Sequence, residues 1–94
     1  MAQMLVRYKV KDYTKWKSVF DEYGSTRKKS GSKGGRIFRN ADNPNEMVLL
    51  LEWDSLEKAK NFAQSQDLKN TRNRAGVVDK PDVYFLEEVE RVKE

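Results

Sequence analysis

A chain of 94 residues with 36% charged and 37% hydrophobic residues has the composition of one globular domain, and no apolar run is long enough to span a bilayer. The absence of Cys and His excludes a disulfide framework, a thiol nucleophile and the usual ligands of a transition metal. The net charge of +4 is unevenly divided, because residues 1–40 carry eleven Lys or Arg against three acids and residues 41–94 carry eight against twelve.

The first third of the chain predicts a strand followed by an aromatic helix. Apolar side chains alternate with others from Met4 to Val10, which is typical of a strand with one buried face. Asp12 is the expected N-cap of a helix that runs to about residue 30 and bends near Gly24. Aromatic residues recur along this helix at steps of three and four and form the stripe that packs on the sheet, namely Tyr13, Trp16, Phe20 and Tyr23.

The middle of the chain predicts a hairpin. Residues 32–39 read as a strand that is weakened by Gly34-Gly35 and marked by charge, both features of an exposed edge. A turn at residues 40–45 leads into a continuous apolar run at residues 47–53. Such a run is typical of a central strand with both faces largely out of water.

The last third predicts helical segments and a final strand. Ser55 lies in a capping sequence before a helix whose buried stripe begins at Leu56. A further short helix is expected from Asp67 to Ala75, closed by Gly76, and a strand at residues 83–86.

This order of elements predicts an α+β fold. Strand, helix, strand, strand, helix, strand gives a ferredoxin-like βαββαβ sandwich with a four-stranded antiparallel sheet. Residues 1–94 then form a single domain, with strands 4–10 and 47–53 inside the sheet and both helices on one face. The start of the chain lacks the basic and apolar regions of a signal peptide, so we expect a cytoplasmic protein.

The sheet has a second face that two helices cannot cover. One side of the central strands is nearly all apolar, whereas the other carries Leu5, Val48 and Leu50 beside charged residues. An apolar patch of this kind marks an interface, so we expect a homodimer that packs sheet against sheet. Glu52 would then pair with Arg7 or Lys9, within or across subunits.

The chain resembles the dimeric α/β-barrel superfamily. The resemblance lies in the order of elements, the aromatic helix at residues 13–20, the Gly34-Gly35 strand and the Leu50-Leu51-Glu52-Trp53 run. Within that superfamily it is similar to small proteins grouped with the antibiotic biosynthesis monooxygenases and polyketide-cyclase-like proteins. The resemblance implies a pocket between the first helix and the sheet, and in members that do chemistry this pocket oxygenates or reshapes aromatic polyketides without a cofactor, or degrades haem. Haem degradation needs an axial His, which this chain lacks.

Tyr23 and Arg27 are the candidate catalytic residues. They lie four residues apart, so both can face a cavity at the end of the aromatic stripe. A phenol can donate a proton, and a guanidinium can hold an anionic or enolate oxygen. Core packing is the more frequent role for such a Tyr, and Arg27 can simply complement the end of the helix.

A second group of residues is expected to bind an aromatic ligand. Aromatic side chains with a few polar groups are typical of small-molecule pockets, although such side chains are more often plain core. Arg72 and Arg74, on the short helix, can close over a ligand as a lid, or can be ordinary surface charge. The candidate ligand-binding residues are Trp16, Phe20, Trp53, Phe62 and Arg74.

Three classes of function remain open from the sequence. The first is a cofactor-free monooxygenase or cyclase acting on an aromatic or polyketide-like molecule. The second is a non-catalytic ligand binder or structural dimer, which the absence of His favours. The third is an RNA-binding module, which ranks last because the outward residues of the central strands include no aromatic platform for bases.

Overall fold

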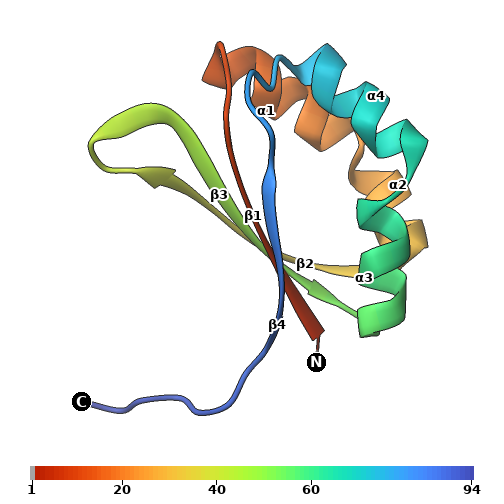
Figure 1. Ribbon diagram of the computed structural model, residues 1–94, viewed down its shortest axis with the longest axis vertical. Helices are drawn as coiled ribbons and strands as arrows, with labels where there is room; N and C mark the ends of the chain where they lie inside the picture. The colour runs from red at the N-terminus through yellow and green to blue at the C-terminus, as the bar shows by residue number, and fades with distance from the viewer. Residues whose placement is uncertain (1) are drawn as a thin grey trace.

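The computed structural model describes residues 2–94 and shows a twisted sheet with helices packed along one side of it (Figure 1). The strand order β2-β3-β1-β4 and the antiparallel pairing of all neighbours confirm the predicted ferredoxin-like fold, with strands β1 and β3 inside. The elements in chain order are β1 (Ala2–Lys9), α1 (Tyr13–Glu22), α2 (Gly24–Ser30), β2 (Ser32–Asn40), β3 (Asn43–Trp53), α3 (Leu56–Ala63), α4 (Gln66–Ala75) and β4 (Asp82–Glu87).

The aromatic helix is divided into two. α1 begins after Asp12, whose carboxylate accepts a hydrogen bond from the Lys15 amide as predicted, and it ends at Glu22. α2 begins at Gly24, the residue at which the sequence predicted a bend. Gly31 ends α2 with φ of 115°, a left-handed conformation that glycine adopts at low cost.

The β2–β3 hairpin depends on a close approach of backbones at Gly35. A Cβ atom on this residue would lie 2.0 Å from the carbonyl oxygen of Leu50 on β3. The pairing also shifts register between Ser32 and Gly34, which is a local irregularity of the kind that often accompanies glycine in a strand. Gly35 therefore permits the approach of this edge strand to the central one, whereas Gly34 adopts a left-handed conformation with φ of 97° at the irregularity.

The core lies between the sheet and the helices, where one parity of the central strands meets the aromatic stripe. The predicted inward set is at most 5% exposed at every position. This set consists of Met4, Val6, Tyr8, Val10, Met47, Leu49, Leu51 and Trp53. The period-two pattern of the two strands thus determines which side chains leave water.

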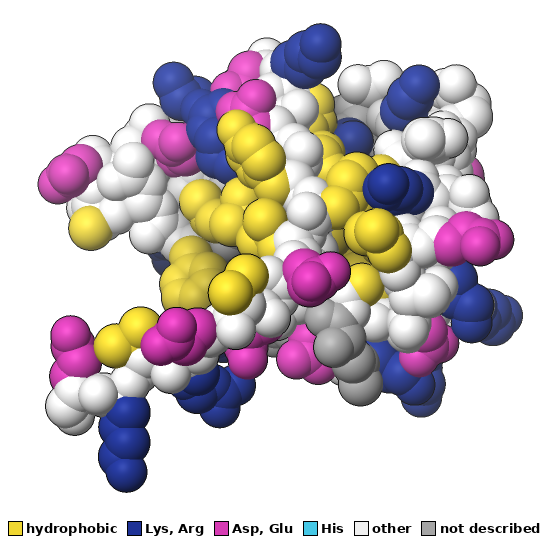
Figure 2. All heavy atoms as spheres, turned by 60° about the horizontal axis from the view of Figure 1, so that its bottom comes forward, with side chains coloured by type: hydrophobic (Ala, Val, Ile, Leu, Met, Phe, Trp, Pro, Cys, Tyr) yellow, Lys and Arg dark blue, Asp and Glu magenta, His cyan; other side chains and the backbone are white. Residues whose placement is uncertain are grey.

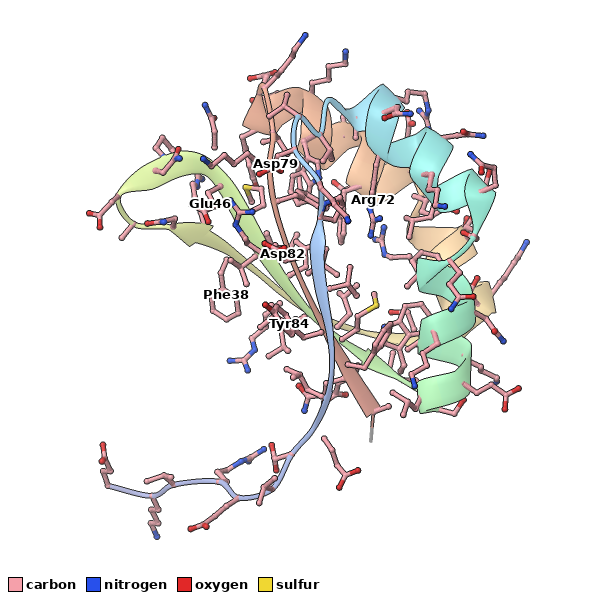
Figure 3. All side chains as sticks on the ribbon, in the orientation of Figure 1. Phe38, Glu46, Arg72, Asp79, Asp82 and Tyr84 are labelled. Carbon is pink, nitrogen blue, oxygen red and sulfur yellow. The ribbon has the colours of Figure 1, made fainter. Side chains whose placement is uncertain are left out.

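The opposite side of the sheet carries the apolar residues that the sequence left uncovered. Leu5, Val48 and Leu50 are half-buried there, and edge-strand neighbours Phe38 and Tyr84 are 45% and 58% exposed. Figure 2 shows hydrophobic side chains gathered along the sheet near the extended C-terminal segment, and Figure 3 places Phe38 and Tyr84 on the side away from the helices. We call this surface the open face; it consists of Leu5, Phe38, Val48, Leu50, Tyr84 and Leu86.

Charged residues at one end of the open face pair differently from the prediction. Arg7 contacts Glu46 at 2.7 Å, Asp79 at 3.3 Å and Asp82 at 3.2 Å. The expected pairing of Arg7 with Glu52 inside the chain is wrong, because the strand register places Glu52 opposite Gln3 and Arg7 opposite Val48.

None of the helices formed by residues 2–94 combines the length and apolar character that crossing a membrane requires.

Candidate functional site

A small cavity lies between the helices and the inner face of the sheet. Its volume is about 50 Å³, which exceeds the space of one water molecule but is well below the roughly 150 Å³ that holds a benzene ring. An aromatic ligand therefore needs side chains at the rim to move. We call this space the helix–sheet cavity; it is lined by Met4, Val6, Tyr8, Trp16, Val19, Phe20, Tyr23, Arg27, Leu49, Leu51, Phe62, Leu68, Thr71, Arg72, Ala75 and Val77.

Most of this lining is apolar, and the strand and helix periods explain why. Alternate residues of β1 and β3 form the floor, because successive side chains of a strand point to opposite faces. α1 contributes Trp16 and Phe20, whose rings lie 5.1 Å apart between centroids at an interplanar angle of 31°. Phe62 of α3 adds a ring on the far side, 5.9 Å from the ring of Tyr23. The cavity can thus accept a flat apolar molecule once it opens.

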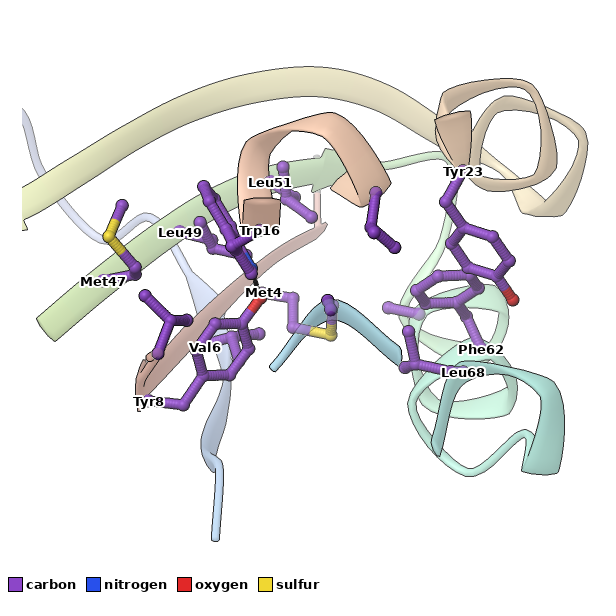
Figure 4. Close-up of a cluster of buried hydrophobic side chains, with 14 of the residues drawn as sticks. Met4, Val6, Tyr8, Trp16, Tyr23, Met47, Leu49, Leu51, Phe62 and Leu68 are labelled. Atoms are coloured by element: carbon purple, nitrogen blue, oxygen red, sulfur yellow. Dashed lines mark hydrogen bonds between the residues drawn. The ribbon is translucent and has the colours of Figure 1, made fainter. Parts of the chain in front are cut away.

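Tyr8 brings a buried hydroxyl to this apolar lining. Its side chain is 4% exposed, and its oxygen accepts a hydrogen bond of 2.9 Å from the indole nitrogen of Trp16 (Figure 4). Burial raises the pKa of the Tyr8 phenol above its usual value. No hydrogen bond uses the proton of this hydroxyl among residues 2–94. Tyr8 therefore keeps one donor for a molecule in the cavity.

Two guanidinium groups also line the cavity. Arg27 stacks on the Phe20 ring, with its central carbon 3.6 Å from the ring centroid, and donates to the Phe20 carbonyl oxygen at 2.7 Å. Arg72 extends from α4 into the space between that helix and the sheet, 6.0 Å from the Tyr8 ring centroid (Figure 3). Burial lowers the pKa of both groups. Neither guanidinium forms an ion pair with a carboxylate among residues 2–94.

Tyr23 lines the cavity with its ring but directs its hydroxyl elsewhere. The hydroxyl donates to the Asp67 carboxylate over 2.6 Å, at the first turn of α4. Figure 4 shows Tyr23 and Tyr8 at opposite ends of the buried cluster. Burial, followed by the hydrogen bond to Asp67, raises the pKa of the Tyr23 phenol. The structure thus gives its proton an acceptor within the chain.

Three of the five predicted ligand-binding residues line the helix–sheet cavity, and two lie outside it. Trp16, Phe20 and Phe62 line the helix–sheet cavity. Trp53 lies behind Phe62, with ring centroids 4.9 Å apart, and does not line the cavity. Arg74 is 56% exposed and pairs with Glu22 of α1 at 3.1 Å, outside the lining.

From the sequence, Tyr8 was not identified as a polar residue of the site, and Arg72 was considered only as part of a lid. The spacing of residues along the strand and the helix nevertheless indicates both. Tyr8 is the hydroxyl-bearing residue in an otherwise aliphatic and Met stripe of β1. Arg72 falls at helical spacing between the buried Leu68 and Ala75, on the stripe that faces the sheet, whereas Arg74 lies two residues further round the helix.

Comparison with known protein families gives a match that covers most of the chain. The family model described as antibiotic biosynthesis monooxygenase matches residues 5–74. No curated protein matches the chain.

Solved structures provide several close matches of fold. A candidate antibiotic biosynthesis monooxygenase from Bordetella bronchiseptica has a TM-score of 0.78 at 17% identity, covering 95% of this chain and 97% of its own. SnoaB, a cofactor-independent oxygenase from Streptomyces nogalater, has a TM-score of 0.77 at 13% identity, covering 99% and 97%. Rv0793 from Mycobacterium tuberculosis has a TM-score of 0.69 at 16% identity, covering 98% of each chain. At these identities the likeness is one of fold.

Proposed function

Because this chain belongs to the antibiotic biosynthesis monooxygenase family, we propose that it is a cofactor-independent oxygenase whose substrate is an aromatic small molecule held in the helix–sheet cavity. The observation that carries the proposal is the composition of the cavity. Apolar and aromatic walls surround a small number of polar groups, which is the usual make-up of a small-molecule site. Among structures of the same fold, SnoaB is described as an oxygenase of this class.

The candidate residues take distinct roles in this proposal. Arg27 is the catalytic candidate, because its guanidinium reaches the cavity and can stabilise negative charge that develops on a substrate oxygen. Tyr23 supplies a wall of the site and positions α4 through Asp67, since its hydroxyl already donates there. Trp16, Phe20 and Phe62 provide surfaces for the aromatic ring.

The substrate enters by displacing flexible side chains at the rim. The present cavity of about 50 Å³ is too small for a fused ring system. Arg27 and Arg72 are half-buried and unbranched near the backbone, so they can swing outward without disturbing the sheet. The strand floor beneath them stays fixed, because its side chains are packed in the core.

A homodimer through the open face forms part of the proposal. Half-buried Leu5, Val48 and Leu50 lie on the open face beside exposed Phe38 and Tyr84, and a second copy of this face would remove these side chains from water. Proteins of this family are generally dimeric. The helix–sheet cavity is lined by side chains of the buried face of the sheet, opposite the open face, so both protomers would keep one.

The second candidate function is a ligand binder without catalysis. Tyr23 already donates its proton to Asp67, and the chain has no His or Cys to act as an acid, base or nucleophile. On this alternative the cavity holds its ligand and releases it unchanged.

Oxygen consumption distinguishes the two. A panel of hydroxylated anthracenes and naphthalenes is incubated with the protein in a sealed cell, and oxygen uptake is followed together with mass spectrometry of the products. The oxygenase proposal expects uptake in which the phenol is oxidised to a quinone, with one atom of O2 incorporated into the product and the other released as water with two hydrogens from the substrate. Arg27→Ala should reduce the rate about tenfold or more, since it removes a charged group from the site. Lys69→Ala, an exposed cation on α4, is the matched control and should leave the rate unchanged. Binding without uptake would support the second candidate.

A further inference from the structure

We propose that the ligand of the helix–sheet cavity carries an anionic oxygen group, held by the Tyr8 hydroxyl and by the guanidinium groups of Arg72 and Arg27. The proposal concerns the charge of the ligand in its ground state, before any reaction. It rests on the proposed function only for the place of binding, the helix–sheet cavity.

The first argument is a balance of charge inside the lining. The lining contains two cations and no carboxylate. Among residues 2–94, Arg72 has neither a hydrogen bond nor an ion pair through its side chain, and Arg27 has one hydrogen bond, to a backbone carbonyl. The carboxylate whose charge acts on Arg27 is that of Asp21, which is exposed and pairs with Lys17 at 2.6 Å. An anionic ligand would supply the missing counter-charge.

The second argument is the unused donor of Tyr8. Its oxygen already accepts from Trp16, which fixes the hydroxyl in position and leaves its proton free to donate. Because the side chain is 4% exposed, bulk water has little access to satisfy that donor. A buried donor without an acceptor costs free energy that a ligand oxygen would recover.

The third argument is that these groups come together in one region. Arg72 lies 6.0 Å from the Tyr8 ring, and both guanidinium charges act on the Tyr8 phenol, lowering its pKa against the larger opposing effect of burial. The Tyr8 hydroxyl and Arg72 therefore lie near one another in the cavity, and Arg27 lines the same cavity. A carboxylate or an enolate oxygen placed there can accept from Tyr8 and from a guanidinium together.

The aromatic walls define the rest of the ligand. Trp16 and Phe20 flank the polar end with their rings, and Arg27 already stacks on Phe20. A flat ring with an acidic substituent would fill both parts of the site. The expected ligand class is thus an aromatic acid, in which the anion is either a carboxylate or an acidic enol.

Binding measured without oxygen tests this inference apart from catalysis. Isothermal titration under argon at pH 8 compares two ionised probes, 2-naphthoate and 2-hydroxy-1,4-naphthoquinone, with neutral analogues of the same shape, methyl 2-naphthoate and 2-methoxy-1,4-naphthoquinone. We expect at least one anion to bind about tenfold or more tightly than its neutral analogue, the size typical of a hydrogen bond to a charged group. Tighter binding of 2-naphthoate would identify the anionic group as a carboxylate, and tighter binding of 2-hydroxy-1,4-naphthoquinone would identify it as an enolate. Equal affinity within both pairs, or no binding of either anion, would overturn the proposal.

Variants assign the preference to the three residues. Arg72→Gln and Tyr8→Phe should each reduce the anion preference severalfold while leaving affinity for the neutral analogue within about twofold. Arg72→Lys should restore part of it, because it keeps the charge without the planar fork. Lys69→Ala on the same helix is the control. Near-ultraviolet circular dichroism checks that each variant is folded, and an undiminished anion preference in folded Arg72→Gln/Arg27→Gln would refute the assignment.

Oxygen uptake with the hydroxylated anthracenes and naphthalenes keeps the two proposals separate, because the four binding probes serve as ligands and not as oxidisable substrates. Selective binding of an anionic probe, with no oxygen uptake from any hydroxylated compound, would leave the present inference standing and contradict the oxygenase proposal. Oxygen uptake from a hydroxylated compound, with equal affinity within both pairs of probes, would do the reverse.

Discussion

The hydroxyl of Tyr23 donates to the carboxylate of Asp67 over 2.6 Å and joins two residues that lie 44 positions apart in the sequence. The bond connects the residue between α1 and α2 with the first turn of α4. It therefore ties together two of the helices that enclose the helix–sheet cavity. The ring of Tyr23 lines that cavity while its polar atom holds the scaffold.

Tyr23→Phe should destabilise the fold by about 1–2 kcal/mol, because it removes a hydrogen bond to a charged acceptor and keeps the ring. Chemical denaturation followed by tryptophan fluorescence measures the change. In an Asp67→Ala background the same substitution should cost much less, since the acceptor is already gone. Equal costs in the two backgrounds would contradict the coupling.

The two buried tryptophans offer a matched pair. Trp16 donates its indole N–H to Tyr8, whereas the indole nitrogen of Trp53 is buried without an acceptor among residues 2–94. Both side chains are at most 1% exposed, so replacement by Phe removes a similar volume from the core.

Trp16→Phe should therefore destabilise the fold more than Trp53→Phe, by about 1–2 kcal/mol, because only the first change removes a hydrogen bond and leaves Tyr8 without its donor. The measurement is the free energy of unfolding in urea at one fixed protein concentration. A larger decrease in the free energy of unfolding for Trp53→Phe than for Trp16→Phe would contradict this prediction.

The open face should hold two copies of the chain together. We expect static light scattering at micromolar concentration to give twice the 11.0 kDa mass of the chain. Leu50→Lys should shift the protein to a monomer that remains folded, because the new charge is unfavourable inside an interface and acceptable in water.

Asn70→Lys is the control for that change. Asn70 is exposed on α4, in the helical layer that packs on the other side of the sheet, so the same new charge there should leave the dimer intact. A monomeric wild-type chain at the same concentration would refute the proposed interface.

Glu46 should make stability depend on pH in the acid range. The hydrogen bond from Arg7, followed by one from Asn40, lowers the pKa of Glu46 below its ordinary value of 4.5. A carboxylate with a lower pKa in the folded state stabilises the fold above about pH 4.5, and this contribution is lost as the pH falls through the folded value.

Glu46→Gln should consequently lose stability at pH 7 and show a flatter decline between neutral and acid pH than the wild type. Thermal unfolding in a series of buffers measures this. Glu90→Gln, in the segment after β4, should follow the wild-type curve. A Glu46→Gln curve parallel to that of the wild type would contradict the prediction.

The sequence by itself determined the fold, because each signal that defines it is local. Alternation along β1 and β3 selected the buried face, Asp12 and Ser55 marked the starts of helices, and Gly31 and Gly76 their ends. These patterns depend on the repeat of a strand or helix, so they can be read without knowing which elements meet. The uncovered apolar side of the sheet followed from the same alternation.

Only the tertiary structure decided the partners of the polar side chains. The acceptor of the Tyr23 hydroxyl is Asp67, which α4 brings within 2.6 Å and which no local pattern indicated. Arg7 was expected to pair with Glu52, yet the register and β4 brought it Glu46 and Asp82 instead. Such pairings depend on the packing of segments far apart in the chain, and a shift of two residues along α4 separates Arg72 in the cavity from Arg74 at the surface. The periods of the backbone determine which side chains are buried, whereas the contacts between elements determine what each buried polar group can do.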